Sequence, residues 1–198
     1  MAGFDGSVSQ IGVSGSDTMP SMNETASQYV QRITGHVAGK RPLAVMATTA
    51  NKIDRLIKSV PARKLRKRPA AGQWSPGEIV AHLADAEIVI GYRIRLILGA
   101  PGTPIVAYDQ DSWVTSGHYA TRDPKKSVEH FCVAREANVS LLKSLTASQW
   151  KRHGMHSERG RETIEQTVRM TAGHDVNHLK QIEGILLKTR SRRKGKPR

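Results

Sequence analysis

The sequence predicts an all-α protein built as a four-helix bundle, and three observations support this fold class. Four long segments carry apolar residues at helical spacing, start signals precede three of them, and the alternating pattern of strands is nearly absent. The 198 residues suffice for one such domain with a tail at each end. We expect a disordered leader over residues 1–22, the bundle over 23–187 and a basic disordered tail over 188–198.

The first helical segment begins near Glu24 and extends through Ile57. Its later half carries apolar residues at helical spacing, namely Leu43, Met46, Ile53, Leu56 and Ile57. The glycine and proline residues between 35 and 42 indicate a break. This segment therefore predicts either one interrupted helix or two shorter helices in succession.

The second helix has the clearest start. Ser75 is a favourable N-cap, Pro76 suits the first helical position, and Glu78 completes a Ser-x-x-Glu capping box. An apolar stripe follows, formed by Ile79, Leu83, Ala86, Ile90, Ile94 and Ile97. Gly99, followed by alanine and proline, ends the helix. His82 lies inside this helix, beside its apolar stripe.

The last two helices also carry start signals. Asp123, with a proline after it, predicts a cap for a third helix that runs to about residue 145. Thr163 and Gln166 form a second capping box, and the helix that follows extends to about residue 188. The connection between the second and third helices is long for a compact domain, and such loops are often functional.

Three histidines are the leading candidates for function. His174 and His178 are one helical turn apart and share a face on the core side of the fourth helix. Together with His82 from a facing helix, they could hold one divalent metal and leave one coordination position open, as in catalytic metal sites. The alternative is three core histidines with ordinary hydrogen-bond partners, because a His-x-x-x-His spacing also arises by chance.

Four acidic residues lie near the histidines: Glu78, Asp85, Asp175 and Glu183. A carboxylate that accepts the outer ring N–H of a ligand histidine fixes its tautomer and raises its basicity. The same residues are equally compatible with surface charges. The zinc-protease pattern His-Glu-x-x-His is not matched, because Asp175 stands where that motif has glutamate.

Several classes of protein are disfavoured. P-loop, dinucleotide-binding and Gly-x-Ser-x-Gly signatures are absent from the sequence. The single cysteine, Cys132, permits no intrachain disulfide and reads as a buried filler. No segment has the apolar length of a membrane span, and the N-terminus lacks the pattern of a secretory signal. We therefore expect a cytoplasmic protein without a membrane partner.

The net charge of +14 is concentrated in two clusters. Seven cations and no acid lie within residues 188–198, and five cations lie within residues 63–68. Removing these twelve leaves 19 basic against 17 acidic residues, so the body is close to neutral. A terminal cluster of this kind either contacts nucleic acid weakly through counterion release or forms a solvated end that aids solubility.

Both histidine segments resemble motifs of the DinB-like superfamily. Residues 74–87, which read Trp-Ser-Pro-Gly-Glu-Ile-Val-Ala-His-Leu-Ala-Asp-Ala-Glu, resemble its helix-two motif. Residues 173–182, which read Gly-His-Asp-Val-Asn-His-Leu-Lys-Gln-Ile, resemble its helix-four motif. Residues 108–113 and 156–160 resemble the DinB_2 branch, which includes YfiT-like metal-dependent hydrolases. The resemblance covers about residues 40–187.

The resemblance implies an up-down-down-up bundle with a divalent metal held by His82, His174 and His178. Relatives in this superfamily include thiol S-transferases that use bacillithiol or mycothiol, and a mycothiol-dependent maleylpyruvate isomerase. In those proteins the metal activates the thiol of the cofactor. A low-molecular-weight thiol is therefore a candidate second cofactor for this chain.

The expected function is metal-dependent attack on a small electrophilic substrate by a thiol or by water, which makes the chain a thiol S-transferase or a hydrolase. Zinc and nickel are the expected metals, since imidazole suits both. Asp109, Gln110 and Trp113 are candidates for the pocket wall, because the long loop can cover the open coordination position. His156 is either a fourth polar group near the site or a histidine that caps a turn before the last helix.

The rival function is a non-enzymatic metal-binding module of the stress response, with the basic tail contacting nucleic acid. Binding of nucleic acid is then expected to be weak and confined to the tail. A homodimer that packs through helix faces is a further hypothesis about partners.

Overall fold

The computed structural model describes residues 24–194, with side chains described as far as residue 188. The predicted leader lies outside the described residues, as do the last four residues of the predicted tail. The elements are, in chain order, α1 (Ala26–Gly35), α2 (Pro42–Lys58), α3 (Ala62–Leu65), α4 (Pro76–Gly99), β1 (Pro104–Ile105), α5 (Gln110–Ser116), α6 (Pro124–Lys143), α7 (Ala147–Trp150), β2 (His153–His156), β3 (Gly160–Thr163) and α8 (Ile164–Lys194). None of these helices combines the length and hydropathy needed to cross a membrane.

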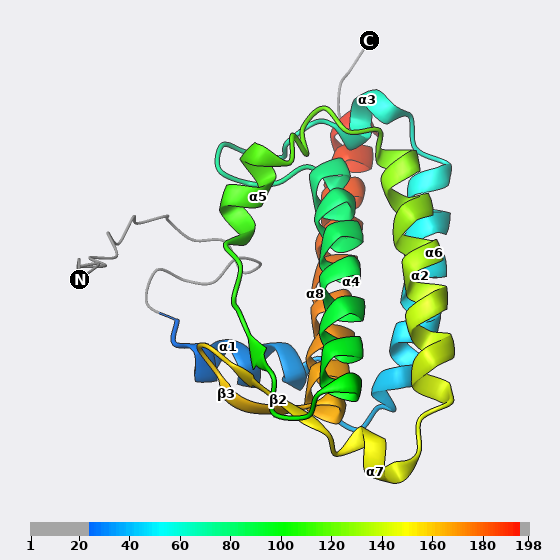
Figure 1. Cartoon of the computed structure of the whole chain (residues 1–198). Coiled ribbons are helices and arrows are strands. Elements are labelled where there is room, and N and C mark those ends of the chain that lie inside the picture. The colour runs from blue at the N-terminus through cyan, green and yellow to red at the C-terminus, as the bar shows by residue number, and fades with distance from the viewer. Residues whose placement is uncertain (1–23, 195–198) are drawn as a thin grey trace, which may run out of the picture.

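The helices α2, α4, α6 and α8 form a four-helix bundle (Figure 1). In that view α2 and α8 run upward whereas α4 and α6 run downward, so the chain order of directions is up-down-down-up. Both α2 and α4 pack against both α6 and α8. Because α4 and α6 are parallel, the chain between them must travel back along the length of the bundle. The four-helix bundle predicted from the sequence is confirmed.

The caps predicted from the sequence are present. Ser75 accepts a hydrogen bond from the Glu78 backbone N–H, and the Glu78 carboxylate accepts one from the Ser75 N–H. The Asp123 side chain accepts two backbone N–H bonds at the start of α6. Thr163 and Gln166 form the same reciprocal pair at the start of α8. The interruption in the first segment is also present and separates α1 from α2.

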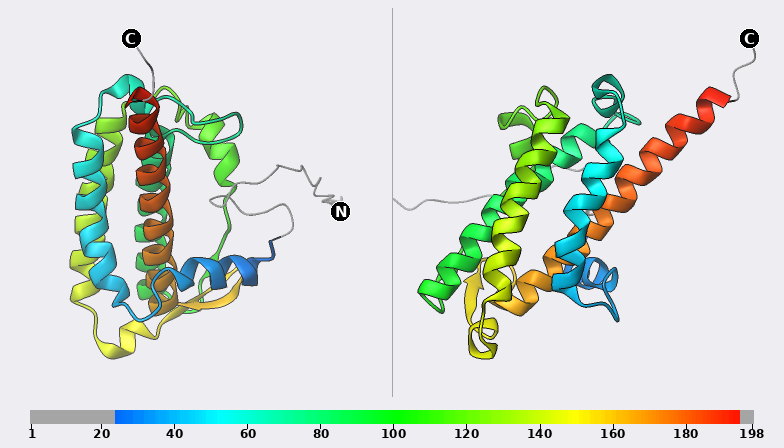
Figure 2. Two further views of the ribbon diagram at one scale, coloured as in Figure 1. Left: turned by 180° about the vertical axis from the view of Figure 1, so that it is seen from behind. Right: turned by 90° about the vertical axis from the view of Figure 1, so that its right-hand side faces the viewer.

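The structure also contains elements that the sequence did not predict. A small sheet has the order β1-β2-β3, with β1 parallel to β2 and β2 antiparallel to β3. Strands of two to four residues are too short to show an alternating pattern. The helix α8 continues to Lys194, beyond the expected end near residue 188, and its last turns extend past the other helices (Figure 2).

A layer of polar residues divides the hydrophobic core into two parts. One apolar cluster, toward the α3 end of the bundle, includes Ile53, Ile57, Leu65, Trp74, Leu83, Phe131 and Ile182. The other, toward the sheet, includes Met46, Ile94, Ile97, Leu142, Ile164 and Val168. The polar residues between them are buried, and they include His82, Glu87, Arg135, Asn138, Asp175 and His178. The candidate site lies in this layer.

Candidate metal centre

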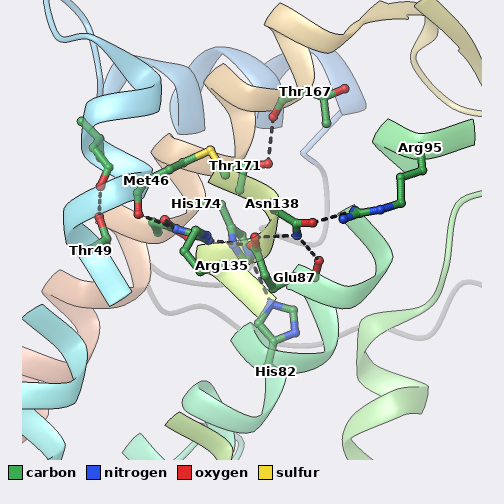
Figure 3. Close-up of polar contacts among 12 residues, drawn as sticks. Met46, Thr49, His82, Glu87, Arg95, Arg135, Asn138, Thr167, Thr171 and His174 are labelled. Carbon is green, nitrogen blue, oxygen red and sulfur yellow. Dashed lines mark hydrogen bonds and ion pairs between the residues drawn. The ribbon is translucent and has the colours of Figure 1, made fainter. Parts of the chain in front are cut away.

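The three predicted histidines meet in the polar layer. The Nε2 atom of His82 lies 3.0 Å from Nε2 of His174, and Nε2 of His178 lies 3.1 Å from the same atom. One ring nitrogen from each of the three residues lies within 4.8 Å of the others. Figure 3 shows His82 of α4 reaching toward His174 of α8. Among the described residues, this is the one cluster of ligand-type side chains with a geometry suited to a metal ion.

Helix geometry explains why the rings converge. His174 and His178 are four residues apart, so both project from the same face of α8. The helix α4 packs against α8 and presents His82 from the other side. Gly173 allows α1 to approach this part of α8, because a Cβ atom there would lie 2.1 Å from the carbonyl oxygen of Ile33. The backbone around the histidines is therefore held by packing on two sides.

The hydrogen-bond partner of His178 fixes its tautomer. Its Nδ1 lies 2.9 Å from Oε1 of Gln181, which can only accept, so Nδ1 carries the hydrogen. In the neutral ring Nε2 then presents a lone pair toward the other histidines. A hydrogen on Nε2 of His174 can point at only one of its two neighbours. The three rings therefore do not satisfy one another by hydrogen bonds alone.

Burial keeps the three imidazoles neutral. Removal from water, with a contribution from the Arg135 charge, lowers the pKa of His174 to about 4. Burial together with the neighbouring His174 lowers the pKa of His178 to about 3. The pKa of His82 also lies well below its ordinary value, because of burial and then of the two other histidines. All three rings are therefore uncharged at neutral pH, which is the form that binds metal.

The arrangement fits a divalent ion. Two nitrogens bound to one zinc ion at about 2.0–2.1 Å and at a tetrahedral angle lie roughly 3.3 Å apart. The two shorter separations in the cluster, 3.0 and 3.1 Å, are close to that value. Three neutral imidazoles suit zinc, nickel or another divalent transition metal, and they leave coordination positions for other ligands.

Trp74 covers the histidines on the side of the α3 end. Its ring centroid lies 5.1 Å from that of His82, and its plane is within 9° of the His178 ring at a centroid distance of 6.4 Å. The indole is only 7% exposed. Water therefore reaches the cluster from the opposite side.

A cavity of about 500 Å³ opens on that opposite side, and His174 forms part of its wall. It lies between α4 and α8 and is covered by α1, by the β2–β3 hairpin and by the segment that leads into α5. Its lining residues are Glu24, Ala26, Tyr29, Ala86, Ile90, Arg93, Tyr108, Asp109, Gln110, Glu158, Arg159, Glu162, Thr167, Met170, Thr171 and His174. This volume accommodates a small organic molecule.

The predicted pocket residues have different places. Asp109 and Gln110 line the cavity, and the Asp109 side chain also caps α5. Trp113 does not line the cavity but packs behind it, with its ring centroid 4.5 Å from that of Tyr108. His156 is buried and accepts a hydrogen bond from the backbone N–H of Glu158 at its Nδ1. It therefore caps the hairpin turn, which is the second of the two roles considered for it.

No hydrogen bond joins the neighbouring acids to the histidines within residues 24–188. Glu78 pairs with Arg68 and belongs to the capping box. Asp85 accepts from the Tyr119 hydroxyl and from Arg122. Asp175 also turns away from the rings. The partner of the His178 ring is the side-chain amide of Gln181 and not a carboxylate.

Asp175 belongs to a second buried cluster, which is charged. The Arg135 guanidinium donates to Asp175, to Glu87 at 2.7 Å and to the Met46 carbonyl at 3.1 Å. Asn138 donates to Glu87 at 2.9 Å, and Figure 3 shows this chain of contacts beside His174. The cluster joins α2, α4, α6 and α8, and all three charged side chains are at most 3% exposed.

Sequence reasoning missed several parts of the site. Trp74 and Gln181 lie within the resembling motifs, but no role was assigned to either. The i, i+3 spacing of His178 and Gln181 was the available signal for the latter. The contribution of α1, which brings Tyr29 to the cavity, left no signal because the contact depends on tertiary packing.

Relatives with similar sequences cover most of the chain. A protein of Oceanobacillus iheyensis is 26% identical over 142 residues, which is 71% of this chain and 81% of the relative. A protein of Halalkalibacterium halodurans is 23% identical over 145 residues, 73% of this chain and 84% of the relative. Both are named provisionally as metal-dependent hydrolases.

Two solved structures share the fold. YfiT from Bacillus subtilis, described as a four-helix bundle of unusual topology, superposes with a TM-score of 0.68 at 21% identity, covering 90% of this chain and 94% of YfiT. The mycothiol-dependent maleylpyruvate isomerase gives a TM-score of 0.59 at 12% identity, covering 71% of this chain and 59% of the isomerase. Residues 46–182 match the DinB_2 family. With this match over more than half of its length, the chain belongs to the DinB superfamily.

Proposed function

We propose that the protein is a divalent-metal-dependent enzyme acting on a small electrophilic substrate, either as a thiol S-transferase or as a hydrolase. One observation carries the proposal: three neutral imidazoles converge on one point, and one of them, His174, lines a cavity of about 500 Å³. The names of the relatives support metal dependence. The mycothiol dependence of the isomerase that shares the fold supports thiol chemistry as one of the two reactions.

In this proposal His82, His174 and His178 hold zinc or nickel. When bound, such an ion supplies a Lewis acid that lowers the pKa of a coordinated water or thiol. Gln181 keeps the His178 ring in the tautomer whose Nε2 is free to bind. Trp74 excludes water from the side away from the cavity. Asp109 and Gln110 form part of the wall that holds the substrate, and Trp113 supports that wall through Tyr108.

Elemental analysis of the untagged protein tests the metal site. We expect about one equivalent of zinc or nickel in the wild type and none in His82→Ala, with unchanged helical circular dichroism. The matched control is His130→Ala on α6, because His130 is exposed and away from the cluster. Stoichiometric metal in His82→Ala would contradict the ligand assignment.

The two reactions differ in their need for a thiol. A panel of electrophilic compounds incubated with the metal-loaded protein should give product only with an added thiol if the protein is a transferase. Product formation in buffer alone identifies a hydrolase. His82→Ala is the background in both assays.

A second candidate property is binding of nucleic acid at one end of the bundle. The basic α3 region and the C-terminal part of α8 lie at the same end (Figure 1). Arg63, Arg66 and Lys67 are exposed there. Truncation after residue 188 should weaken DNA binding and flatten its dependence on salt, because fewer counterions are released. Equal affinity before and after truncation would exclude a role for the tail.

A further inference from the structure

The ionic groups of the hairpin side of the cavity are paired with each other. Glu162 accepts a hydrogen bond from Arg159 at 2.6 Å and another from the Thr167 hydroxyl at 2.8 Å. Burial alone would raise the pKa of Glu162, but the contact with Arg159 and the Thr167 hydrogen bond outweigh it and hold the pKa below its ordinary value. Both charges are thus already compensated without a ligand.

The carboxylates on the remaining walls of the cavity are also compensated, either by hydrogen bonds or by water. Glu24 forms two hydrogen bonds with the Arg32 guanidinium, at 2.8 and 2.9 Å. The Asp109 carboxylate accepts from the backbone N–H groups of Asp111 and Ser112. Glu158 is exposed at the rim, where water solvates its charge. None of these acids needs a ligand to balance it.

Arg93 is different from these groups. Its side chain is partly buried in the cavity wall, donates one hydrogen bond to the Val106 carbonyl and lies over the Tyr108 ring at 5.4 Å. Within the described part of the chain, no carboxylate lies within ion-pairing distance of it. Glu158 and Glu162 act on it only from farther away, and the nearby Arg159 opposes them. A guanidinium with free N–H groups therefore faces the cavity.

Arg93 and the histidine cluster lie at opposite ends of one helix face. His82, Ala86, Ile90 and Arg93 follow one another at spacings of three or four residues on α4. Eleven residues correspond to a rise of roughly 16 Å along the helix. Ala86 and Ile90 line the cavity between the two ends, and Met170 adds an apolar surface from α8. The cavity thus offers a metal-type site, an apolar middle and a cation.

We propose that Arg93 binds a carboxylate at the end of the substrate remote from its reacting group, and that the substrate is an extended molecule with an apolar middle. A planar guanidinium matches a carboxylate through two parallel hydrogen bonds, and partial burial strengthens the pair. The inference rests on the proposed function, because it takes the histidine cluster as the place of reaction. It adds the class of substrate and the residue that selects it.

Two hydroxamic acids of equal length test the inference in the zinc-loaded protein. Suberic acid monohydroxamate carries a hydroxamate that chelates zinc and a carboxylate at its far end, whereas octanohydroxamic acid ends in a methyl group. Calorimetric titration should show that the wild type binds the charged probe about 10-fold more tightly or better, as expected for a charge-assisted pair. Arg93→Met should abolish this preference and leave the affinity for octanohydroxamic acid unchanged.

Arg161→Met is the matched control, because Arg161 is an exposed cation on the neighbouring strand β3 and lies outside the cavity lining. It should keep the full preference. A preference that persists in Arg93→Met overturns the inference, as does equal binding of the two probes by the wild type. Zinc content and circular dichroism equal to those of the wild type show that Arg93→Met is folded and loaded.

A further titration separates this inference from the proposed function. If neither hydroxamate binds the wild type, the metal function is contradicted. Octanoate, which carries the carboxylate but no hydroxamate, then tests Arg93 alone in the metal-free protein. Weak binding by the wild type that is lost in Arg93→Met supports the carboxylate site, and equal titrations of the two proteins overturn it.

Discussion

Two buried polar clusters lie side by side in the bundle and are built on opposite principles. The histidine cluster is neutral and borders a cavity. The cluster around Arg135 is charged, almost fully enclosed and joined by hydrogen bonds to all four long helices. His174 and Asp175 are consecutive residues, so the two clusters share one turn of α8. The charged cluster therefore holds the four helices together, whereas the neutral cluster has the composition of a binding site.

The difference shows in how each cluster satisfies its members. The carboxylates of Glu87 and Asp175 each receive donors from Arg135, whose Nε is its one buried atom without a partner among the described residues. The histidines instead bring three ring nitrogens to a common point without satisfying one another. A cluster that is complete by itself rigidifies the bundle, whereas an incomplete one is available for binding.

The largest expected effect is the response of the metal-free protein to acid. The pKa of His174 is about 4 and that of His178 about 3 in the folded state, against about 6.5 in an unfolded chain. Because the pKa of both residues is lower in the folded state, acid protonates them in the unfolded chain first and favours unfolding. The free energy of unfolding is therefore at its full value above pH 6.5 and falls as the pH drops toward 4. In that range each residue lowers the free energy of unfolding by about 1.4 kcal/mol per pH unit, and the pair lowers it by about 3 kcal/mol per pH unit.

Urea unfolding of the metal-free protein between pH 7 and pH 5 measures this loss. The double variant His174→Gln/His178→Gln is the control and should show a shallower dependence on pH. A free energy of unfolding that stays constant over this range in the wild type would show that these rings are solvated in the folded state.

The second effect concerns the charged cluster. Arg135→Met leaves the carboxylates of Glu87 and Asp175 buried without their cation, and we expect a loss of about 3–5 kcal/mol in the free energy of unfolding. Arg122→Met is the matched control, because its partner Asp85 is partly exposed and such pairs contribute about 0–1 kcal/mol. Similar losses in the two variants would remove the distinction between frame and surface.

The smallest effect concerns the orientation of one ring. Gln181→Leu removes the acceptor that holds Nδ1 of His178, and we expect metal affinity to fall about 10–100-fold with little change in stability. Competition with a chelator measures the affinity. Gln181→Glu retains an acceptor at this position and should bind metal at least as tightly as the wild type. Wild-type affinity in Gln181→Leu would mean that packing alone orients the ring.

Local signals explain the success of the sequence analysis. The capping box at Ser75, the cap at Asp123 and the i, i+4 pair on α8 each depend on residues within one turn of one another. Such patterns survive whatever the rest of the chain does. The convergence of His82 with that pair was reachable because an apolar stripe fixes which face of each helix turns inward.

Long-range contacts were not predictable in the same way. Asp175 was considered as a partner of the histidines, but its partner is Arg135, 40 residues earlier in the sequence. The placement of Tyr29 in the cavity depends on the packing of α1 against Gly173. Arg93 carries no motif, and its free guanidinium becomes evident only when every neighbouring charge has been accounted for.

The spacing of the three histidines along the chain has a consequence for folding. His82 is 92 residues away from His174, whereas His178 is four residues from it. An unfolded chain can offer a metal ion the local pair, but recruiting the third ring would cost roughly 4–5 kcal/mol of loop-closure entropy. Three-ligand affinity thus arises only once α4 and α8 have packed. Metal binding would then add to the free energy of unfolding of a bundle that already folds without it, and chelation would remove that added stability.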